Sequence, residues 1–416
     1  MTARTEEAGP QGLASALLQS GALHSDWLPT YKAVPRHLFV PDRMWPGIPD
    51  GTRQNPLVDR TADPDAWFRA VFSDIPLTTQ WDDGNHAGDG LGTTPSSSSS
   101  QPHMVFSMLA DLDVRDGHRV LEIGTGTGWN AGLLSHRLGP ANVVSIEFDP
   151  EVAKGAGRNL RAAGLCPLVI VGDGRLGYAG SAPYDRVIAT CSIGEVPPAW
   201  IEQNVAGGVI VAPWATGYGG EAIARLTVND DGTASGRFTR SSAFMRLRQQ
   251  RQNKPPHDVY LKGQEWPADG DRSTTALSPA EVGGWLEQFV IGLRMPGAFW
   301  TAEHYDGGAY TLWTYSTDRK SWASADYEPE RQGYEVVQSG PRRLWDETET
   351  AYRWWEEQGR PGFDRFGLTA DIDGERAWLD SPNNPLSRER NKPNDFFQSP
   401  APEPTFTHIP VRGPGL

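Results

Sequence analysis

The chain has 416 residues, and at about 150 residues per domain this length predicts two or three folding units. Its 38 basic and 52 acidic residues give a formal net charge of −14, which argues against nucleic acid as a partner because phosphates would be repelled. No apolar run reaches about 18 residues, and the two cysteines, Cys166 and Cys191, cannot form a disulfide framework. We therefore expect a soluble, cytoplasmic, monomeric protein that binds no membrane.

Residues 1–110 are expected to form the N-terminal helices and loops of the first domain. Apolar residues recur at helical spacing over residues 11–40. Pro, Gly and Asp are frequent from 41 to 94, which indicates loops. Five consecutive serines then occupy positions 96–100, directly ahead of Gln-Pro-His-Met. Out of context such a tract is typical of a flexible linker, but its position favours a functional role.

Residues 111–245 alternate short apolar runs with amphipathic segments, which is typical of a parallel sheet with helices on both faces. Two later runs flank an Asn-Asp-Asp-Gly-Thr turn and predict an antiparallel hairpin at the edge of that sheet. The fold class expected here is therefore α/β. The predicted parallel strands are residues 119–124, 143–149, 167–174, 184–190 and 207–214.

Residues 246–381 change in character and predict a C-terminal α+β module for substrate recognition, followed by a Pro-rich tail over 382–416. Ser278, with Glu281 three residues later, matches a capping box and predicts the start of a helix. The tail is polar, so we expect it to be disordered or to lie along the surface. The module is also expected to contain a helix over 342–359 and hairpins over 309–328 and 366–380.

A glycine-rich loop over residues 124–128 follows a predicted strand and opens a predicted helix. Glu147 closes the next strand, where an acid can accept hydrogen bonds from ribose hydroxyls. Asp173 ends the third strand and is placed to accept from an adenine amino group. Glu122, just ahead of the glycines, suits an aminoacyl group better than a pyrophosphate. The pattern therefore favours S-adenosylmethionine (SAM), and a dinucleotide site is the alternative.

These segments, with Ser-Gln-Pro-His-Met and AVPRHLFVP at residues 33–41, resemble the successive motifs of protein-L-isoaspartate O-methyltransferases over roughly residues 24–248. The resemblance implies a Rossmann-like class I SAM-dependent methyltransferase fold that releases S-adenosylhomocysteine. It implies Ser100 as the active serine, with Ser99 and Ser98 in support. The cofactor-binding residues that it implies are Glu122, Gly124, Thr125, Gly126, Gly128, Glu147, Phe148, Asp173 and Gly174.

We expect the substrate to contact His103, which adjoins the serine tract, and Thr190, which follows the fourth strand. Arg246 and Arg248 lie in a window, residues 240–262, that holds six Lys and Arg against one Asp. These arginines could hold an acidic peptide, or they could pair with acids of the C-terminal module and join the domains.

No metal is expected, because methylation of a carboxylate does not need one. Asp82, Asp83, His86 and Asp89 are therefore interpreted as parts of a Gly-rich turn over the donor pocket rather than as ligands. Cys191 is expected to be a buried, unreactive thiol.

Three departures from the repair enzymes point to a more specific resemblance. The chain inserts residues 78–96, expands the serine tract, and continues for about 170 residues past the end of a minimal repair enzyme. These features resemble methyltransferases encoded beside ATP-grasp ligases in graspetide (ω-ester peptide) clusters, with lanthipeptide-associated homologues as an alternative. The resemblance implies methylation of an aspartate in a macrocyclised ribosomal peptide, followed by closure to an aspartimide, or by isoaspartate after hydrolysis. The sequence also leaves open a general isoaspartate repair enzyme and a non-catalytic peptide-binding protein.

Overall fold

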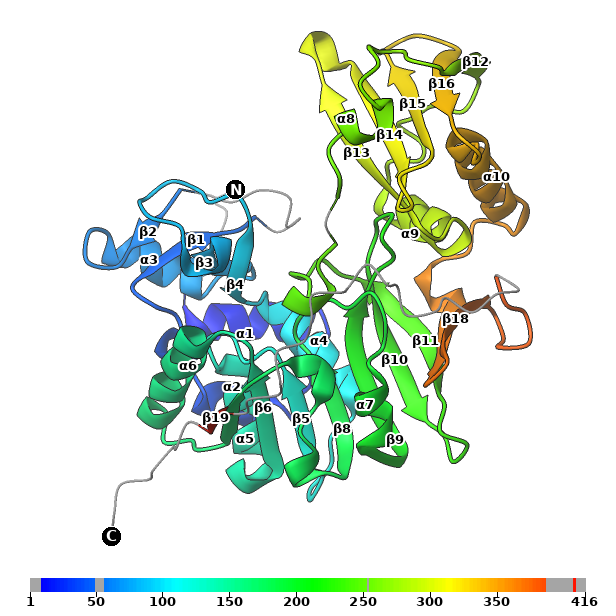
Figure 1. The fold of residues 1–416 in the computed structure, drawn as a ribbon. Helices are drawn as coiled ribbons and strands as arrows, with labels where there is room; N and C mark the ends of the chain where they lie inside the picture. Colours follow the sequence, from blue (N-terminus) through cyan, green and yellow to red (C-terminus); the bar gives the residue numbers. More distant parts are fainter. Residues whose placement is uncertain (1–8, 49–55, 253, 387–406, 409–416) are drawn as a thin grey trace.

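The computed structural model describes residues 9–48, 56–252, 254–386 and 407–408. The described residues form one large sheet of ten strands, a four-stranded sheet near the N-terminus, and a five-stranded sheet in the C-terminal third (Figure 1). The predicted α/β class is confirmed, because the large sheet has a parallel centre whose strands are linked by helices.

The centre of the large sheet contains five parallel strands in the order β9-β8-β5-β6-β7. Most of their residues are buried Val, Ile, Leu and Ala, as expected of strands covered on both faces. The strands are β5 (Val120–Ile123), β6 (Val143–Glu147), β7 (Leu168–Val171), β8 (Tyr184–Ala189) and β9 (Asn204–Trp214). Helix α4 (Pro102–Leu112) precedes β5 in the sequence. Three more helices lie between the strands: α5 (Trp129–Leu138), α6 (Pro150–Ala162) and α7 (Pro198–Glu202).

Antiparallel strands extend both edges of this sheet. The predicted hairpin is present as β10 (Ala222–Val228) and β11 (Ala234–Ser241). A second hairpin, β17 (Phe366–Asp371) and β18 (Gly374–Leu379), pairs with β11, although its residues fall within the range predicted for the C-terminal module. Because this hairpin covers β11, β11 is not left as an exposed edge. At the other edge, β19 (Thr407–His408) pairs with β7; the rest of the predicted tail from residue 387 on lies outside the described residues.

The N-terminal part contains more regular structure than the sequence indicates. The expectation of loops over 41–94 is wrong in part, because this range contains three short strands that form a sheet with the serine strand in the order β2-β1-β3-β4. The serine tract itself is a strand paired with β3, so the linker interpretation is excluded. The elements are α1 (Pro10–Gln19), α2 (Leu28–Ala33), β1 (Arg43–Pro46), β2 (Val58–Asp59), α3 (Pro64–Val71), β3 (Leu77–Trp81) and β4 (Pro95–Ser99).

The C-terminal third forms a β-rich accessory module, defined here as residues 256–358. Its antiparallel sheet has the order β12-β16-β15-β14-β13, and α9 and α10 accompany it (Figure 1). The elements are α8 (Asp258–Leu261), β12 (Asp271–Thr275), α9 (Trp285–Arg294), β13 (Ala298–His304), β14 (Tyr310–Ser316), β15 (Trp322–Tyr327), β16 (Tyr334–Ser339) and α10 (Leu344–Glu357).

The capping-box pattern at Ser278 does not start a helix. The Ser278 backbone N–H does donate to the Glu281 carboxylate at 3.1 Å, but these residues form a turn. The helix α9 begins only at Trp285, after Gly283 and Gly284, because two glycines oppose helix propagation. Within the described ranges, the helices are too short or too polar to cross a bilayer.

Candidate active site

A cavity of about 770 Å³ lies at the carboxyl ends of β5, β6 and β8, where α/β sheets of this kind bind ligands. Its volume is in the range of small-molecule and cofactor sites. Among the predicted site residues, those that line it are Ser98, Ser99, Ser100, Gly124, Thr125, Gly126, Glu147, Phe148, Gly174, Thr190, Arg246 and Arg248.

The glycine loop is held in place by the neighbouring strands. The backbone N–H groups of Gly124 and Thr125 donate to the Ile146 carbonyl of β6, and the Thr190 hydroxyl donates to the Gly124 carbonyl at 2.5 Å. Gly126 has φ of +55°, and a Cβ there would lie 3.2 Å from the Ser98 carbonyl oxygen. Only glycine therefore lets the loop pass this close to the serine strand.

Glu147 ends β6 at the cavity wall. One carboxylate oxygen accepts from the Gly126 N–H at 2.9 Å and the other from the Asp149 N–H at 3.0 Å. Burial raises its pKa, and these two hydrogen bonds act against the rise. A carboxylate offers about four acceptor positions, so Glu147 keeps capacity for two ligand hydroxyls.

Two of the predicted cofactor acids do not line the cavity and are bonded to other side chains of the protein. Both carboxylate oxygens of Glu122 are used inside the protein, where Asn130 donates at 2.7 Å and Ser145 at 2.5 Å. Burial raises the pKa of Glu122 to about 7. Asp173 accepts two side-chain hydrogen bonds from Arg175 to one oxygen, at 2.7 and 3.0 Å. Gly128 does not line the cavity either. The structure therefore does not support direct contact between Glu122 and a ligand.

The serine strand rests on a buried arginine that sequence reasoning did not assign. Arg36 is 1% exposed and lies in the 3₁₀ turn Arg36–Leu38. Its guanidinium donates to the hydroxyl and carbonyl of Ser99 and to the carbonyl of Ser100, at 2.8 to 3.2 Å. It also donates to the carbonyls of three residues that precede β3, Val71, Ser73 and Ile75. Arg36 therefore fixes the backbone of the tract against the segment that follows α3.

The hydroxyl groups of Ser98 and Ser100 differ from that of Ser99. Ser99 is 2% exposed and its hydroxyl is bonded to Arg36. Ser98 and Ser100 are half-buried at the cavity wall, and neither hydroxyl has a hydrogen-bond partner within the described part of the chain. These two groups are therefore available to a ligand.

Arg246 also lines the cavity, near Cys191 and Glu221. Its guanidinium donates only to the carbonyls of Ala215 and Thr216, at 3.3 and 3.5 Å, and it forms no ion pair with any acid in the described ranges. Burial lowers its pKa and the Glu221 carboxylate opposes that shift. Burial raises the pKa of the Cys191 thiol, so it stays protonated at neutral pH, as expected of an unreactive cysteine.

Arg248 is in a different state, because its charge is already neutralised. It pairs with Asp83 and with Asp149, both at 3.1 Å, and its guanidinium lies 5.6 Å from the Phe148 ring centroid. Arg251 also pairs with Asp83, at 2.8 Å. The basic window is thus joined to the inserted residues 78–96 and to the core, and these two arginines do not pair with acids of the accessory module.

The inserted segment is organised around its acids. The Asp82 carboxylate accepts from the backbone N–H groups of Thr93 and Thr94, which holds the turn closed. Asp89 pairs with Arg43, and the His86 ring contacts the Gly90 carbonyl. In the described ranges, no group of three or more His, Cys, Asp or Glu side chains is arranged to hold a metal ion.

One predicted substrate residue, His103, does not line the cavity, and one residue that does, Trp285, was not predicted from the sequence. His103 is the second residue of α4, with its backbone N–H donating to Asp74 and its ring 3.4 Å from the Ser20 hydroxyl, and it does not line the cavity. Trp285, the first residue of α9, does line the cavity, is 45% exposed, and donates its indole N–H to the Glu221 carbonyl at 3.0 Å. Its contribution depends on how the accessory module packs, so no local pattern identifies it.

The donor side of the cavity fits SAM. The glycines provide a close backbone approach, since a Cβ at Gly124 would lie 2.9 Å from the Thr190 hydroxyl and a Cβ at Gly174 would lie 2.5 Å from the Ile123 side chain. Glu147 supplies free acceptor capacity for ribose hydroxyls beside this loop.

The chain is similar in sequence to known proteins over about half of its length. The family model described as "Protein-L-isoaspartate(D-aspartate) O-methyltransferase (PCMT)" matches residues 58–252. Protein-L-isoaspartate O-methyltransferase 1 of Archaeoglobus fulgidus is 40% identical over 184 residues, which are 44% of this chain and 68% of that protein. The enzyme of the same name from Ignicoccus hospitalis is 38% identical over 201 residues, or 48% and 78% of the two chains. A solved protein-L-isoaspartate O-methyltransferase aligns with a TM-score of 0.49 at 20% identity, covering 89% of this chain and all of that one.

Proposed function

The chain belongs to the protein-L-isoaspartate O-methyltransferase family, a family of carboxyl O-methyltransferases that use SAM, and we propose that its acceptor is an aspartate side chain in a modified ribosomal peptide. The observation that carries the proposal is the pair of unpartnered hydroxyls, Ser98 and Ser100, beside the glycine loop. They lie where an acceptor carboxylate would need donors.

When bound, SAM supplies an electrophilic methyl carbon on a sulfonium. It would transfer this methyl group to the acceptor carboxylate and leave as S-adenosylhomocysteine, which keeps the electron pair of the broken carbon–sulfur bond. Residues 124–127 of the glycine loop and Glu147 would hold the donor, since they line the cavity and the Gly126 N–H donates to Glu147. No proton moves, because a carboxyl of pKa about 4 is already ionised at neutral pH.

The chain's part in this reaction is to align and partly dehydrate the carboxylate. The hydroxyls of Ser98 and Ser100 can donate to the carboxylate oxygen that does not react. Arg246 can pair with the acceptor or with a neighbouring acid of the peptide, because its guanidinium has no ion-pair partner in the described ranges. Serine therefore acts by position, and no covalent serine intermediate is needed.

Two features favour a macrocyclised peptide of the graspetide type over an arbitrary damaged protein. Trp285 brings the accessory module to the cavity, and the ion pairs of Asp83 with Arg248 and Arg251 hold the inserted segment over it. Such additions narrow an acceptor cleft, and a preorganised cyclic peptide loses less entropy on entering it.

The methyl ester would then close to an aspartimide without further help from the chain. The backbone nitrogen of the next residue attacks the ester carbonyl, and a nitrogen–carbon bond replaces the carbon–methoxy bond. The proton from nitrogen leaves with methoxide as methanol. Water can later open the imide to isoaspartate.

General repair of L-isoaspartyl residues is the second candidate. It is favoured by the position of the glycine loop and the serine strand, both of which lie inside residues 58–252 that match the family model. In this case the module and the insertion would add stability or regulation rather than select the substrate.

One experiment separates the two candidates. Methylation is measured side by side on an ω-ester macrocyclised peptide, its linear precursor, and a short L-isoaspartyl peptide, with SAM binding measured by isothermal titration. The first proposal predicts the highest kcat/KM on the macrocycle. Preference for the isoaspartyl peptide would establish repair instead, and SAM binding without methylation of any peptide would contradict both.

A further inference from the structure

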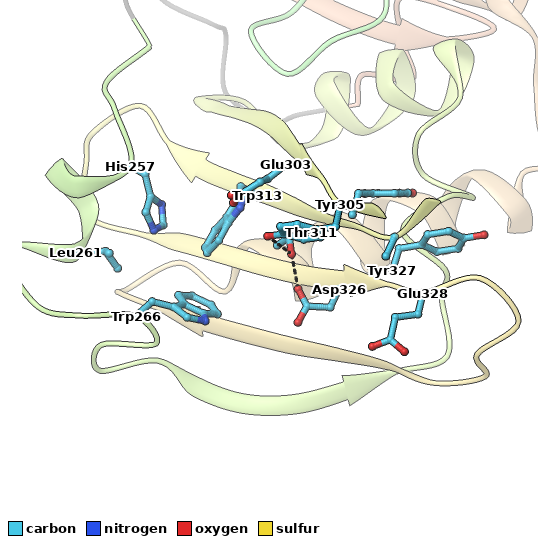
Figure 2. Close-up of a pocket in the computed structure, with 12 residues that line it drawn as sticks. His257, Leu261, Trp266, Glu303, Tyr305, Thr311, Trp313, Asp326, Tyr327 and Glu328 are labelled. Carbon is cyan, nitrogen blue, oxygen red and sulfur yellow. Dashed lines mark hydrogen bonds between the residues drawn. The ribbon is translucent and has the colours of Figure 1, made fainter. Parts of the chain in front are cut away.

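A second cavity, of about 530 Å³, lies on the sheet of the accessory module (Figure 2). It shares no lining residue with the active-site cavity. Its lining contains both aromatic side chains and acids, and none of its lining residues is Lys or Arg. It is lined by His257, Leu261, Trp266, Glu303, Tyr305, Ala309, Tyr310, Thr311, Trp313, Asp326, Tyr327 and Glu328.

The strand register explains why the acids come together. Glu303 of β13 is directly opposite Thr311 of β14, and Thr311 is directly opposite Asp326 of β15. Directly paired residues project on the same face of a sheet, with Cα atoms about 5 Å apart. The Asp326 carboxylate accepts from the Thr311 hydroxyl at 2.7 Å, which Figure 2 shows at the centre of the cavity.

An aromatic wall adjoins this row. Trp313 is two residues along β14 from Thr311 and therefore faces the same side. Trp266 closes that end from the segment ahead of β12, with its ring centroid 4.7 Å from that of Trp313. Toward the other end, the Tyr305 hydroxyl lies 3.4 Å from the Thr311 hydroxyl. Trp266 is 42% exposed, so its ring is presented to solvent at the rim.

The charge of the cavity is compensated only in part. Glu328 pairs with Arg331 at 2.7 Å, but Glu303 and Asp326 form no ion pair with a described residue. Burial lowers the pKa of His257, so its ring is neutral at pH 7. Lys254 lies over the Phe299 ring, four residues from Glu303 along β13, or about 13 Å at the rise of a strand.

Rings combined with unpaired carboxylates are suited to a cation, because aromatic faces and acids attract the same charge. The geometry points to a binding site for a Lys or Arg side chain, and we propose that it captures a basic residue of the peptide whose aspartate is methylated. The identity of the ligand as a residue of the substrate peptide rests on the proposed function. The preference of the cavity for a cation does not depend on that function.

The distance between the two cavities limits how far apart the reacting aspartate and the basic residue can be in the peptide. Arg251 lines the active-site cavity and His257 lines the second one, and they are six residues apart. Six Cα–Cα steps span at most about 23 Å. An extended peptide covers that distance in about seven residues, so the basic residue is expected within about seven positions of the reacting aspartate.

Binding to the cavity is tested without SAM and without any acid in the probe. A fluorescently labelled Gly/Ser decapeptide with one central Arg is compared by anisotropy with the same peptide carrying citrulline, a neutral isostere. The Arg peptide is expected to bind about tenfold more tightly. The double variant Glu303→Gln/Asp326→Asn should abolish that preference. The control double variant Glu202→Gln/Glu357→Gln, an equal loss of charge at two exposed residues outside both cavities, should leave it unchanged.

Equal binding of the two peptides, or an unchanged preference in the double variant, would overturn the proposal. So would saturable binding of an uncharged oligosaccharide such as chitohexaose when the Arg peptide does not bind, since aromatic walls also accept sugars. Thermal melting of each variant reports whether it is folded.

A kinetic measurement links the cavity to the reaction. On a methylated substrate with Arg seven residues from the aspartate, the double variant should raise KM about tenfold and leave kcat within twofold. If no peptide is methylated, the proposed function fails while the binding result still decides the cation site. An unchanged KM would exclude the cavity from substrate capture.

Discussion

The two sides of the active-site cavity differ in how their polar groups are satisfied. On the donor side, Glu147 and the loop over residues 124–128 are fixed by hydrogen bonds inside the protein. On the acceptor side, the Ser98 and Ser100 hydroxyls and the Arg246 guanidinium face the cavity without a hydroxyl or carboxylate partner among the described residues. The first arrangement suits a ligand that is the same in every turnover. The second suits a carboxylate that must arrive from outside.

The largest expected effect lies beneath the acceptor side. Arg36→Met removes six hydrogen bonds to the hydroxyl and carbonyls around the serine strand and leaves buried carbonyls without donors. We expect it to lower the free energy of unfolding by roughly 3 to 5 kcal/mol. Chemical denaturation measures this change, and a loss below about 1 kcal/mol would show that Arg36 does not support the strand.

On the donor side, Glu147→Ala should weaken SAM binding about ten- to a hundredfold. A charge-assisted hydrogen bond contributes roughly 1.5 to 3 kcal/mol, and this substitution also releases the Gly126 N–H. Isothermal titration gives the affinity directly. Asp173→Asn provides a comparison, because Asp173 is bonded to Arg175 and does not line the cavity. If Glu147→Ala bound SAM as tightly as the wild type, the assignment of Glu147 as the ribose contact would be wrong.

Two arginines of the basic window, Arg246 and Arg248, should differ in their effects on the kinetics of methylation. Arg246→Gln is expected to raise the KM for the peptide about tenfold, because it removes a cation that faces the cavity unpaired. Arg248→Gln should change KM by less than about threefold, since Asp83 and Asp149 already neutralise Arg248. Initial rates at varied peptide concentration distinguish them. Equal effects would mean that the ion pairs open when substrate binds.

The smallest expected effect is a pH dependence of stability. Burial raises the pKa of Glu122 from 4.5 to about 7, so the folded protein holds a proton that the unfolded chain has released. The stability contributed by Glu122 is therefore full below about pH 4.5 and is lost as the pH rises through about 7. Relative to Glu122→Gln, the wild type should lose melting temperature between about pH 5 and pH 8. Parallel melting curves for the two proteins would contradict this assignment.

The sequence predicts the parallel core well, because its strands are short apolar runs separated by helix patterns and a glycine loop. It places Glu147 correctly at the cavity, since an acid at the end of the second strand adjoins the loop in any fold of this kind. Glu122 and Asp173 carry the same local signal, but their carboxylates are bonded to Asn130, Ser145 and Arg175. Side-chain direction of this kind depends on tertiary contacts and not on spacing.

Long-range packing decides the remaining features. Trp285 lies 37 residues past Arg248 in sequence, yet both line one cavity because α9 packs against the core. The hairpin of β17 and β18 has an ordinary Asp-Gly turn signal, but nothing local indicates that it pairs with β11. The serine tract has the composition of a linker, and it becomes a strand because Arg36 and β3 satisfy its backbone.

The contrast between the two sides is tested most directly by the double variant Ser98→Ala/Ser100→Ala, assayed for SAM affinity and for peptide methylation in the same preparation. Removing two hydroxyls that have no partner in the described part of the protein should leave its stability and its SAM affinity within about twofold. The kcat/KM for the peptide should fall about a hundredfold, at roughly 1.5 kcal/mol for each hydrogen bond lost to a charged acceptor. Unchanged methylation, or a loss of SAM binding that matches the loss of methylation, would contradict the assignment of these serines to the acceptor.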